Sequence, residues 1–132
     1  MTELFVPYNE ALELKQLGFD EPCLASIRKD RNFPYIPSKG GLFSNHLFNN
    51  DFAVPCPLHS QSFRFFREKY KLFCETRTSV VVKENRLTFS GWVINLHKGE
   101  PIGEYAGSGE TYEEVELACL RKLIELCKEK NG

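Results

Sequence analysis

The sequence predicts a single α+β domain over residues 1–132, with an antiparallel sheet of three strands, or slightly more, packed against helices. Two observations lead to this prediction. Residues 111–130 repeat their apolar side chains with a helical period and so form one broad apolar face. Residues 74–106 are rich in β-branched and aromatic residues and are interrupted at two turn segments. A helix with a wide apolar face beside three short strands is typical of a layered α+β fold.

Length and composition narrow the class of protein. A chain of 132 residues suffices for one domain with a core. Its net charge of -1 gives no overall field that would attract nucleic acid or an anionic membrane. The N-terminus lacks a basic region followed by an apolar run, and no stretch is apolar enough to span a bilayer. The five cysteines are odd in number. We therefore expect a cytoplasmic protein with reduced thiols, no signal peptide and no membrane association.

Residues 1–57 are expected to form an N-terminal helix followed by an irregular, aromatic-rich extension. The helix is predicted over Pro7–Leu17, with Gly18 as its stop, and a short strand over Cys23–Arg28. Lys29–Pro57 combines prolines and glycines with many aromatic residues. Two interpretations stay open for this segment: a long loop that covers one side of the core, which we favour, or a binding surface.

Residues 58–130 are predicted to run helix, three strands, helix. The expected elements are a helix over Leu58–Tyr70, strands over Cys74–Lys83, Arg86–Leu96 and Pro101–Ala106, and a helix over Thr111–Lys130. Asn85 and Gly99 are the predicted turn residues. Thr111 and Glu114 have the spacing of a capping box, and Gly107-Ser108-Gly109 is expected to be a tight turn before the last helix.

This order resembles the double-stranded-RNA-binding domain, and GEYAGSGETYEEVELACLRKLIEL is similar to that family's junction between its last strand and last helix. The family grips phosphates with lysines at the start of that helix, whereas this chain has Glu110, Glu113 and Glu114 there. Its Gly-Pro-x-His hairpin motif is replaced by Lys83-Glu84-Asn85-Arg86. The resemblance therefore implies the topology, and we do not expect binding of double-stranded RNA.

A second resemblance covers more of the chain. FVPYNEALELKQLGFDEPC, SFRFFREKY and TYEEVELACLRKLIEL resemble segments shared by small uncharacterised proteins of bacteria and their phages. This resemblance implies an intracellular protein of bacterial, phage or other mobile-element origin. It transfers no site residues.

Two motifs contain residue types that can carry chemistry. Cys56-Pro-Leu-His59 has a ligand-like spacing, with Cys23 and His46 as possible further zinc ligands, but a lone C-x-x-H motif favours packed side chains. The glycines before the last helix precede acidic residues, which would repel a phosphate. We therefore predict no metal, no cofactor and no catalytic residues.

The leading functional hypothesis is a non-catalytic binding protein that acts through a protein partner. The alternative is a nucleic-acid or nucleotide binder that uses the face of Arg64, Arg67 and Lys71 with nearby aromatic residues; an enzyme of unknown class is the third hypothesis. The candidate binding residues are Arg64, Arg67, Lys71 and Trp92.

Overall fold

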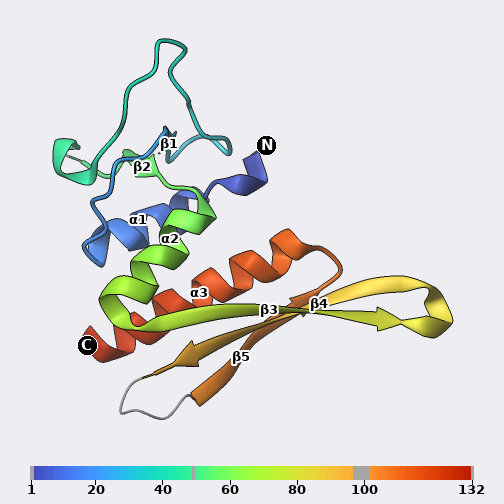
Figure 1. Cartoon of the computed structure of the whole chain (residues 1–132). Coiled ribbons are helices and arrows are strands. Elements are labelled where there is room, and N and C mark those ends of the chain that lie inside the picture. Colours follow the sequence, from blue (N-terminus) through green and yellow to red (C-terminus); the bar gives the residue numbers. More distant parts are fainter. Residues whose placement is uncertain (1, 49, 97–101, 132) are drawn as a thin grey trace. The chain divides into compact units, whose positions relative to one another are not determined.

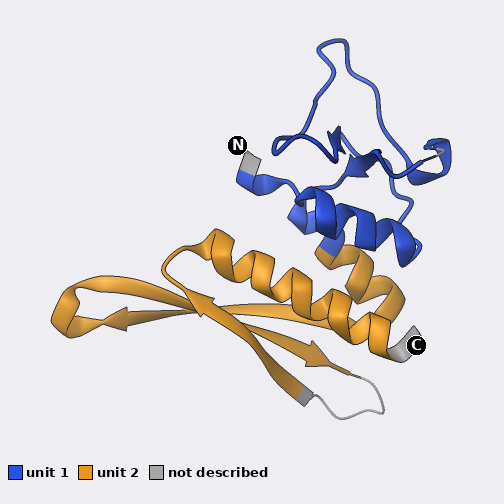
Figure 2. Cartoon of the chain, turned by 180° about the vertical axis from the view of Figure 1, so that it is seen from behind, with its two compact units in different colours: residues 1–62 blue, residues 63–132 orange. Residues whose placement is uncertain are grey.

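The computed structural model describes residues 2–48, 50–96 and 102–131. The chain forms two compact units, residues 1–62 and residues 63–132 (Figure 2), and each is described by itself. The predicted α+β class is confirmed: helices accompany one antiparallel sheet of two strands and another of three. That residues 1–132 behave as one domain stays a prediction.

The first unit is built on a short helix and a two-stranded sheet. Its elements are the 3-10 turn η1 (Thr2–Leu4), helix α1 (Tyr8–Gln16), strand β1 (Ala25–Arg28), the 3-10 turn η2 (Asn45–Leu47) and strand β2 (Ala53–Cys56). The predicted first helix is confirmed, and Gly18 takes a left-handed φ of 96° just after it. The fully or almost fully buried side chains of this unit include Val6, Ala11, Leu14, Phe19, Cys23, Ala25, Val54 and Cys56.

Strand β2 lies within the segment for which we expected a loop. It pairs antiparallel with β1, Ala25 lying opposite Cys56 and Arg28 opposite Ala53. Pro55 argues against a strand in the sequence because it has no N–H to donate, but a two-stranded sheet has only edge strands, where proline is tolerated. Two isolated bridges, Ser26 with Tyr35 and Cys23 with Phe43, tie the intervening chain to the region of β1.

The second unit has the predicted order of helix, three strands and helix. Helix α2 (His59–Phe65) begins in the last residues of the first unit and continues into the second. It leads into a π-helical turn, η3 (Phe66–Tyr70), followed by β3 (Leu72–Val81), the 3-10 turn η4 (Val82–Glu84), β4 (Arg86–Asn95), β5 (Ile102–Gly109) and α3 (Tyr112–Asn131). The sheet has the order β3-β4-β5, and both pairs are antiparallel, as expected. Asn85 adopts the predicted left-handed turn conformation, whereas Gly99 and Pro101 lie outside the described residues.

Helix α3 packs across one face of this sheet (Figure 1). Its buried side chains are Val115, Cys119, Leu120, Leu123, Ile124 and Cys127. The expected apolar face is therefore largely confirmed, although Tyr112 is 45% exposed. Gly91 of β4 permits the close approach, because a Cβ at this position would lie only 2.4 Å from Cys119 Sγ.

The expected glycine turn before α3 is wrong. Strand β5 continues through Gly107-Ser108-Gly109, with Gly109 opposite Phe89 and Gly107 opposite Gly91. Thr111 does act as a cap: its hydroxyl accepts a hydrogen bond from the Glu114 N–H at 3.2 Å. The Glu114 carboxylate reaches one residue further back than a capping box requires and accepts from the Glu110 N–H at 3.2 Å.

Candidate binding surfaces

The three basic residues singled out in the sequence lie around the π-helical turn of the second unit. Arg64 belongs to α2 and Arg67 to η3, and Lys71 ends the turn with a left-handed φ of 56°. All three are exposed, and so is Glu68 in the same turn. The positive charge of this face is therefore interrupted by a carboxylate.

Trp92 lies on the other side of the same sheet. Its neighbours Gly91 and Val93 face α3, so alternation along β4 turns Trp92 away from that helix. Residues 63–70 lie on the α3 side in both views (Figures 1 and 2). The structure therefore does not bring Trp92 together with the three basic residues.

Neighbouring side chains already contact the Trp92 ring. Its centroid lies 5.4 Å from that of Tyr105, and the Arg77 guanidinium carbon is 5.2 Å away. The same Arg77 pairs with Glu75 at 2.9 Å. These contacts make Trp92 a packing residue of this sheet face, of which Tyr105 is the most exposed ring, at 52%.

The Cys56–His59 motif is built into the first unit rather than arranged around an ion. The Cys56 thiol donates a hydrogen bond to the Val6 carbonyl at 3.0 Å, and burial raises its pKa to about 12. His59 is 6% exposed; burial lowers its pKa, and the Glu10 carboxylate opposes part of that shift. In the described part of the chain, no group of three His, Cys, Asp or Glu side chains is placed to hold a metal ion.

The remaining cysteines also lie among packing residues. All five are free thiols. Burial raises the pKa of Cys23 to about 12. In the second unit the Cys74 thiol hydrogen-bonds to Cys119, which raises the pKa of Cys74 and lowers that of Cys119. Because Cys119 is fully buried on the face of α3 that packs against the sheet, it is not presented to a substrate.

The glycine-rich approach to α3 is filled by the protein's own carboxylate. A Cβ at Gly109 would lie 2.4 Å from Glu114 Oε2, so the carboxylate rests against the strand. The same carboxylate accepts a hydrogen bond from the Glu110 N–H. This arrangement keeps a carboxylate at the N-terminus of α3, where its negative charge would repel a phosphate.

A projecting hairpin of the second unit was not anticipated as a surface. We call residues 78–89, the distal parts of β3 and β4 with η4, the arm. Strand β5 pairs with β4 only as far as Phe89, which lies opposite Gly109, so the arm is two-stranded (Figure 1). Val80, Val82 and Leu87 of the arm are 62%, 84% and 51% exposed.

A second surface lies in the first unit, where cations and aromatic rings alternate. We call it the basic–aromatic surface and define it by Tyr8, Arg28, Lys29, Arg31, Phe33, Tyr35 and Phe52. The Arg28 guanidinium lies 4.9 Å from the centre of the Phe52 ring, and that of Arg31 lies 5.9 Å from that of Phe33. Phe33, Tyr35 and Phe52 are 54%, 61% and 48% exposed.

Three open hollows run along the basic–aromatic surface. The largest, of about 540 Å³, is lined by Tyr8, Asn9, Leu12, Lys29, Asp51 and Phe52. A second, of about 350 Å³, shares Tyr8, Asn9 and Lys29 with it and adds Arg31. The third, of about 330 Å³, is lined by Ser26, Arg28, Arg31, Phe33 and Tyr35. Because these hollows share lining residues, they adjoin one another along the basic–aromatic surface.

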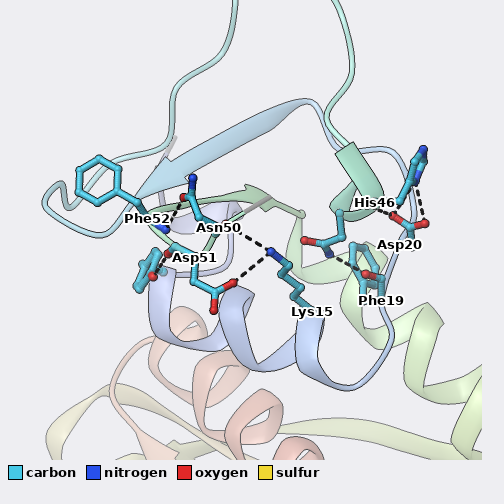
Figure 3. Close-up of polar contacts among 9 residues, drawn as sticks. Lys15, Phe19, Asp20, His46, Asn50, Asp51 and Phe52 are labelled. Carbon is cyan, nitrogen blue, oxygen red and sulfur yellow. Dashed lines mark hydrogen bonds and ion pairs between the residues drawn. The ribbon is translucent and has the colours of Figure 1, made fainter. Parts of the chain in front are cut away.

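The chain that carries Phe52 is tied down to α1 (Figure 3). The Lys15 ammonium contacts the Asp51 carboxylate at 3.0 Å, and the Tyr8 hydroxyl donates to the Asp51 carbonyl. The Phe52 N–H donates to the Asn50 side chain at 2.9 Å. These bonds hold one wall of the largest hollow in place.

A second anchor lies at η2, in the same close-up. The Asn45 side chain donates to the Phe19 carbonyl at 2.6 Å. The Asp20 carboxylate accepts from the backbone N–H of His46 at 2.9 Å and pairs with its ring, and these contacts hold the pKa of Asp20 below its usual value. The long segment after β1 is thus held at both η2 and Asp51.

Sequence reasoning missed the arm, whereas a binding surface over Lys29–Pro57 was the less favoured of the two interpretations of that segment. The one local signal for the basic–aromatic surface is the run Arg28-Lys29-Asp30-Arg31 just before Phe33 and Tyr35. No helix in the described residues is both long and apolar enough to cross a membrane. No protein-family model matches the chain, and neither the curated proteins nor the solved structures include a significant match.

Proposed function

We propose that the chain is a non-catalytic, intracellular binding protein of bacterial or phage origin that acts through a protein partner, and that the arm is its docking surface. The observation that carries this proposal is the exposed apolar tip formed by Val80, Val82 and Leu87. Burying one such side chain is worth roughly 1.5–3 kcal/mol. A partner that covers the tip would gain this free energy.

The apolar tip continues the row of side chains that α3 covers further along the sheet. Cys74, opposite the buried Val93, lies on the α3 face, and alternation places Val80 and its cross-strand partner Leu87 on the same face. The contact between Phe89 and Tyr112, the first residue of α3, marks where the helix begins and its cover of the sheet stops. Val80 and Leu87 lie two residue pairs further out along the ladder, beyond that contact.

The edge of the arm is also suited to a protein. Strand β3 pairs only with β4 in the described part of the sheet, so the backbone groups on its other side have no strand neighbour. An extended partner segment can add to such an edge and place its own apolar side chains beside Val80.

The charges around the tip support a protein rather than a nucleic acid. Arg86 pairs with Glu84 and lies 3.4 Å from Glu110. Lys83 precedes Glu84 in the sequence. An apolar centre with a rim of both signs is the usual anatomy of a protein interface.

The face of Arg64, Arg67 and Lys71 is the second candidate, for nucleic acid or a nucleotide. The exposed cations around one turn, to which Lys69 also belongs, favour it, and the exposed Glu68 among them weakens it. Double-stranded RNA remains outside the proposal, because the start of α3 is acidic and its carboxylate is used internally.

The proposal is tested by comparing what the full chain and its arm variant retain from a host extract. Val80→Glu with Leu87→Glu places two charges on the tip, and Leu4→Glu is the matched control at an apolar residue that is 56% exposed. We expect the wild-type chain and the control to retain the same protein at least tenfold better than the arm variant does. Equal retention by all three chains would refute docking at the arm.

Sedimentation of the purified chain separates a foreign partner from a second copy. A dimer that the arm variant alone loses would identify the partner as another copy of this chain. A monomer that is unchanged by the substitution is the expected result.

A further inference from the structure

We infer that the basic–aromatic surface of the first unit binds single-stranded nucleic acid, a function separate from the proposed docking at the arm. Residues 25–43 contain four basic residues and one acidic residue, although the whole chain has a net charge of -1. The positive charge is therefore concentrated on one segment. Its aromatic rings and hollows lie on the same segment and on the parts of the chain tied to it.

The cations supply the contacts for a phosphate backbone. Lys29 and Arg31 are exposed; Lys29 lines both hollows that share Tyr8, and Arg31 lines the smaller of these two. Arg28 has one acidic partner, Asp30, at 3.0 Å, and its guanidinium also lies over Phe52. An exposed pair of this kind is weak, so a phosphate can compete for the guanidinium.

The rings supply the contacts for bases. Phe33, Tyr35 and Phe52 all expose close to half of their surface or more, and they border the largest and the smallest of the three hollows. A base of any identity gains binding free energy when it stacks on an exposed aromatic ring. The guanidinium groups beside Phe33 and Phe52 offer a second planar surface for stacking.

The surface is organised before any ligand arrives. Ser26 and Tyr35 exchange two backbone hydrogen bonds, of 3.0 Å and 2.7 Å, and the Lys29 N–H donates to the Phe52 carbonyl at 2.7 Å. With the anchors at Asp51 and η2, these bonds fix the rings relative to the cations. Less ordering entropy is then lost on binding.

The combination of cations and exposed rings favours a single-stranded nucleic acid over two other anionic partners, an acidic peptide and a duplex. An acidic peptide would use the cations but has no need for several open ring faces. A duplex would also use the cations, but its bases are stacked on one another and do not offer their faces to Phe33 or Tyr35. Interleaved cations and exposed rings are the combination that single-stranded nucleic acids use.

Fluorescence anisotropy of the full chain with a labelled oligothymidylate tests the inference directly. We expect binding that weakens with salt, with a slope of about −2 in log–log form for three phosphate contacts on a single strand. Lys29→Ala with Arg31→Ala should weaken binding at least tenfold and lower the slope by roughly 0.7 for each cation removed. Phe33→Ala with Tyr35→Ala should weaken binding about as much and leave the slope unchanged.

Control variants assign the binding to this surface. Arg64→Ala with Arg67→Ala removes exposed cations of the other candidate face, and Val80→Glu with Leu87→Glu changes the arm; neither should alter the affinity by more than about twofold. Loss of binding in the Arg64 and Arg67 variant alone would move the site to that face and overturn the inference.

The identity of the ligand is tested by competition. A duplex of the same sequence and a polyglutamate peptide should displace the labelled strand at least tenfold less well than the unlabelled strand. Equal displacement by either competitor, or no binding at micromolar protein, would contradict the inference. None of these results decides whether the arm retains a protein, because the retention experiment tests that separately.

Discussion

At the scale of single residues, Gly91 determines how closely α3 approaches the three-stranded sheet. A Cβ at this position would lie 2.4 Å from Cys119 Sγ and 2.8 Å from Val115 Cγ1, and both side chains are fully buried. Gly91→Ala should therefore overpack this contact and reduce the free energy of unfolding by about 1–3 kcal/mol, measured by urea denaturation.

Gly103 of β5 is the matched control for Gly91, because a Cβ there would meet nothing within 4 Å. Gly103→Ala should leave the free energy of unfolding within about 1 kcal/mol of the wild type, since alanine also reduces the entropy of the unfolded chain. Equal losses in the two variants would mean that close approach is not the reason for glycine at Gly91.

His59 makes the stability of the first unit depend on pH. Burial lowers its pKa in the folded chain, and the unfolded chain has the ordinary value near 6.5. Between these two pKa values the unfolded chain binds the extra proton, so stability is lost as the pH falls below about 6.5. Urea midpoints measured between pH 7.5 and pH 5.5 should therefore decrease in the wild-type chain.

The difference between the wild-type chain and one variant isolates this titration. His59→Gln should flatten the dependence over that range relative to the wild-type chain. A wild-type dependence that survives in the His59 variant would assign the pH effect to another group.

At the scale of elements, the apolar face of α3 holds the second unit together. Leu123 is fully buried, as expected from the helical period. Leu123→Ala should cost about 2–5 kcal/mol in the free energy of unfolding. The control is Glu125→Ala, which removes an exposed carboxylate 3.7 Å from Lys122 and should cost no more than about 0.5 kcal/mol. Comparable effects would show that the buried face does not dominate the stability of this unit.

Elements with a strong period or composition could be predicted from the sequence. The first helix, the three strands of the second unit and α3 all appear near their expected bounds, because apolar period and β-branched residues act locally. Strand β2 was missed because Pro55 excludes it by the usual rule, and only its pairing with β1 shows that an edge was available. The glycines of β5 indicated a turn, yet Gly107 lies opposite Gly91 in the sheet, and a Cβ there would lie 2.9 Å from Ala118 Cβ.

The candidate surfaces could be predicted less well, because both depend on distant parts of the chain. Tyr8 and Phe52 reach the same hollow as Lys29 only through the fold of the first unit. The exposure of Val80 and Leu87 depends on where α3 stops along β4, which no pattern within the strands reports. The sequence shows that Arg64 and Arg67 are charged and that Trp92 is aromatic. It does not show on which side of the sheet each of them lies.

At the scale of the whole molecule, two surfaces of different chemistry lie on different units. The arm offers apolar side chains with charges of both signs, whereas the basic–aromatic surface carries concentrated positive charge. The net charge of -1 conceals this asymmetry. A chain with one surface for a protein and another for a nucleic acid strand is able to bring the two ligands together.

The central claim, docking of a protein at the arm, is tested most directly by site-specific photocrosslinking in the host cell. A photoreactive residue replaces Val82, which is 84% exposed at the tip, or Leu4, which is 56% exposed in the first unit, as the control. The account predicts one discrete protein adduct from Val82 that is absent from Leu4 and disappears when Val80→Glu and Leu87→Glu are added. No adduct from Val82, or the same adducts from both positions, would contradict it.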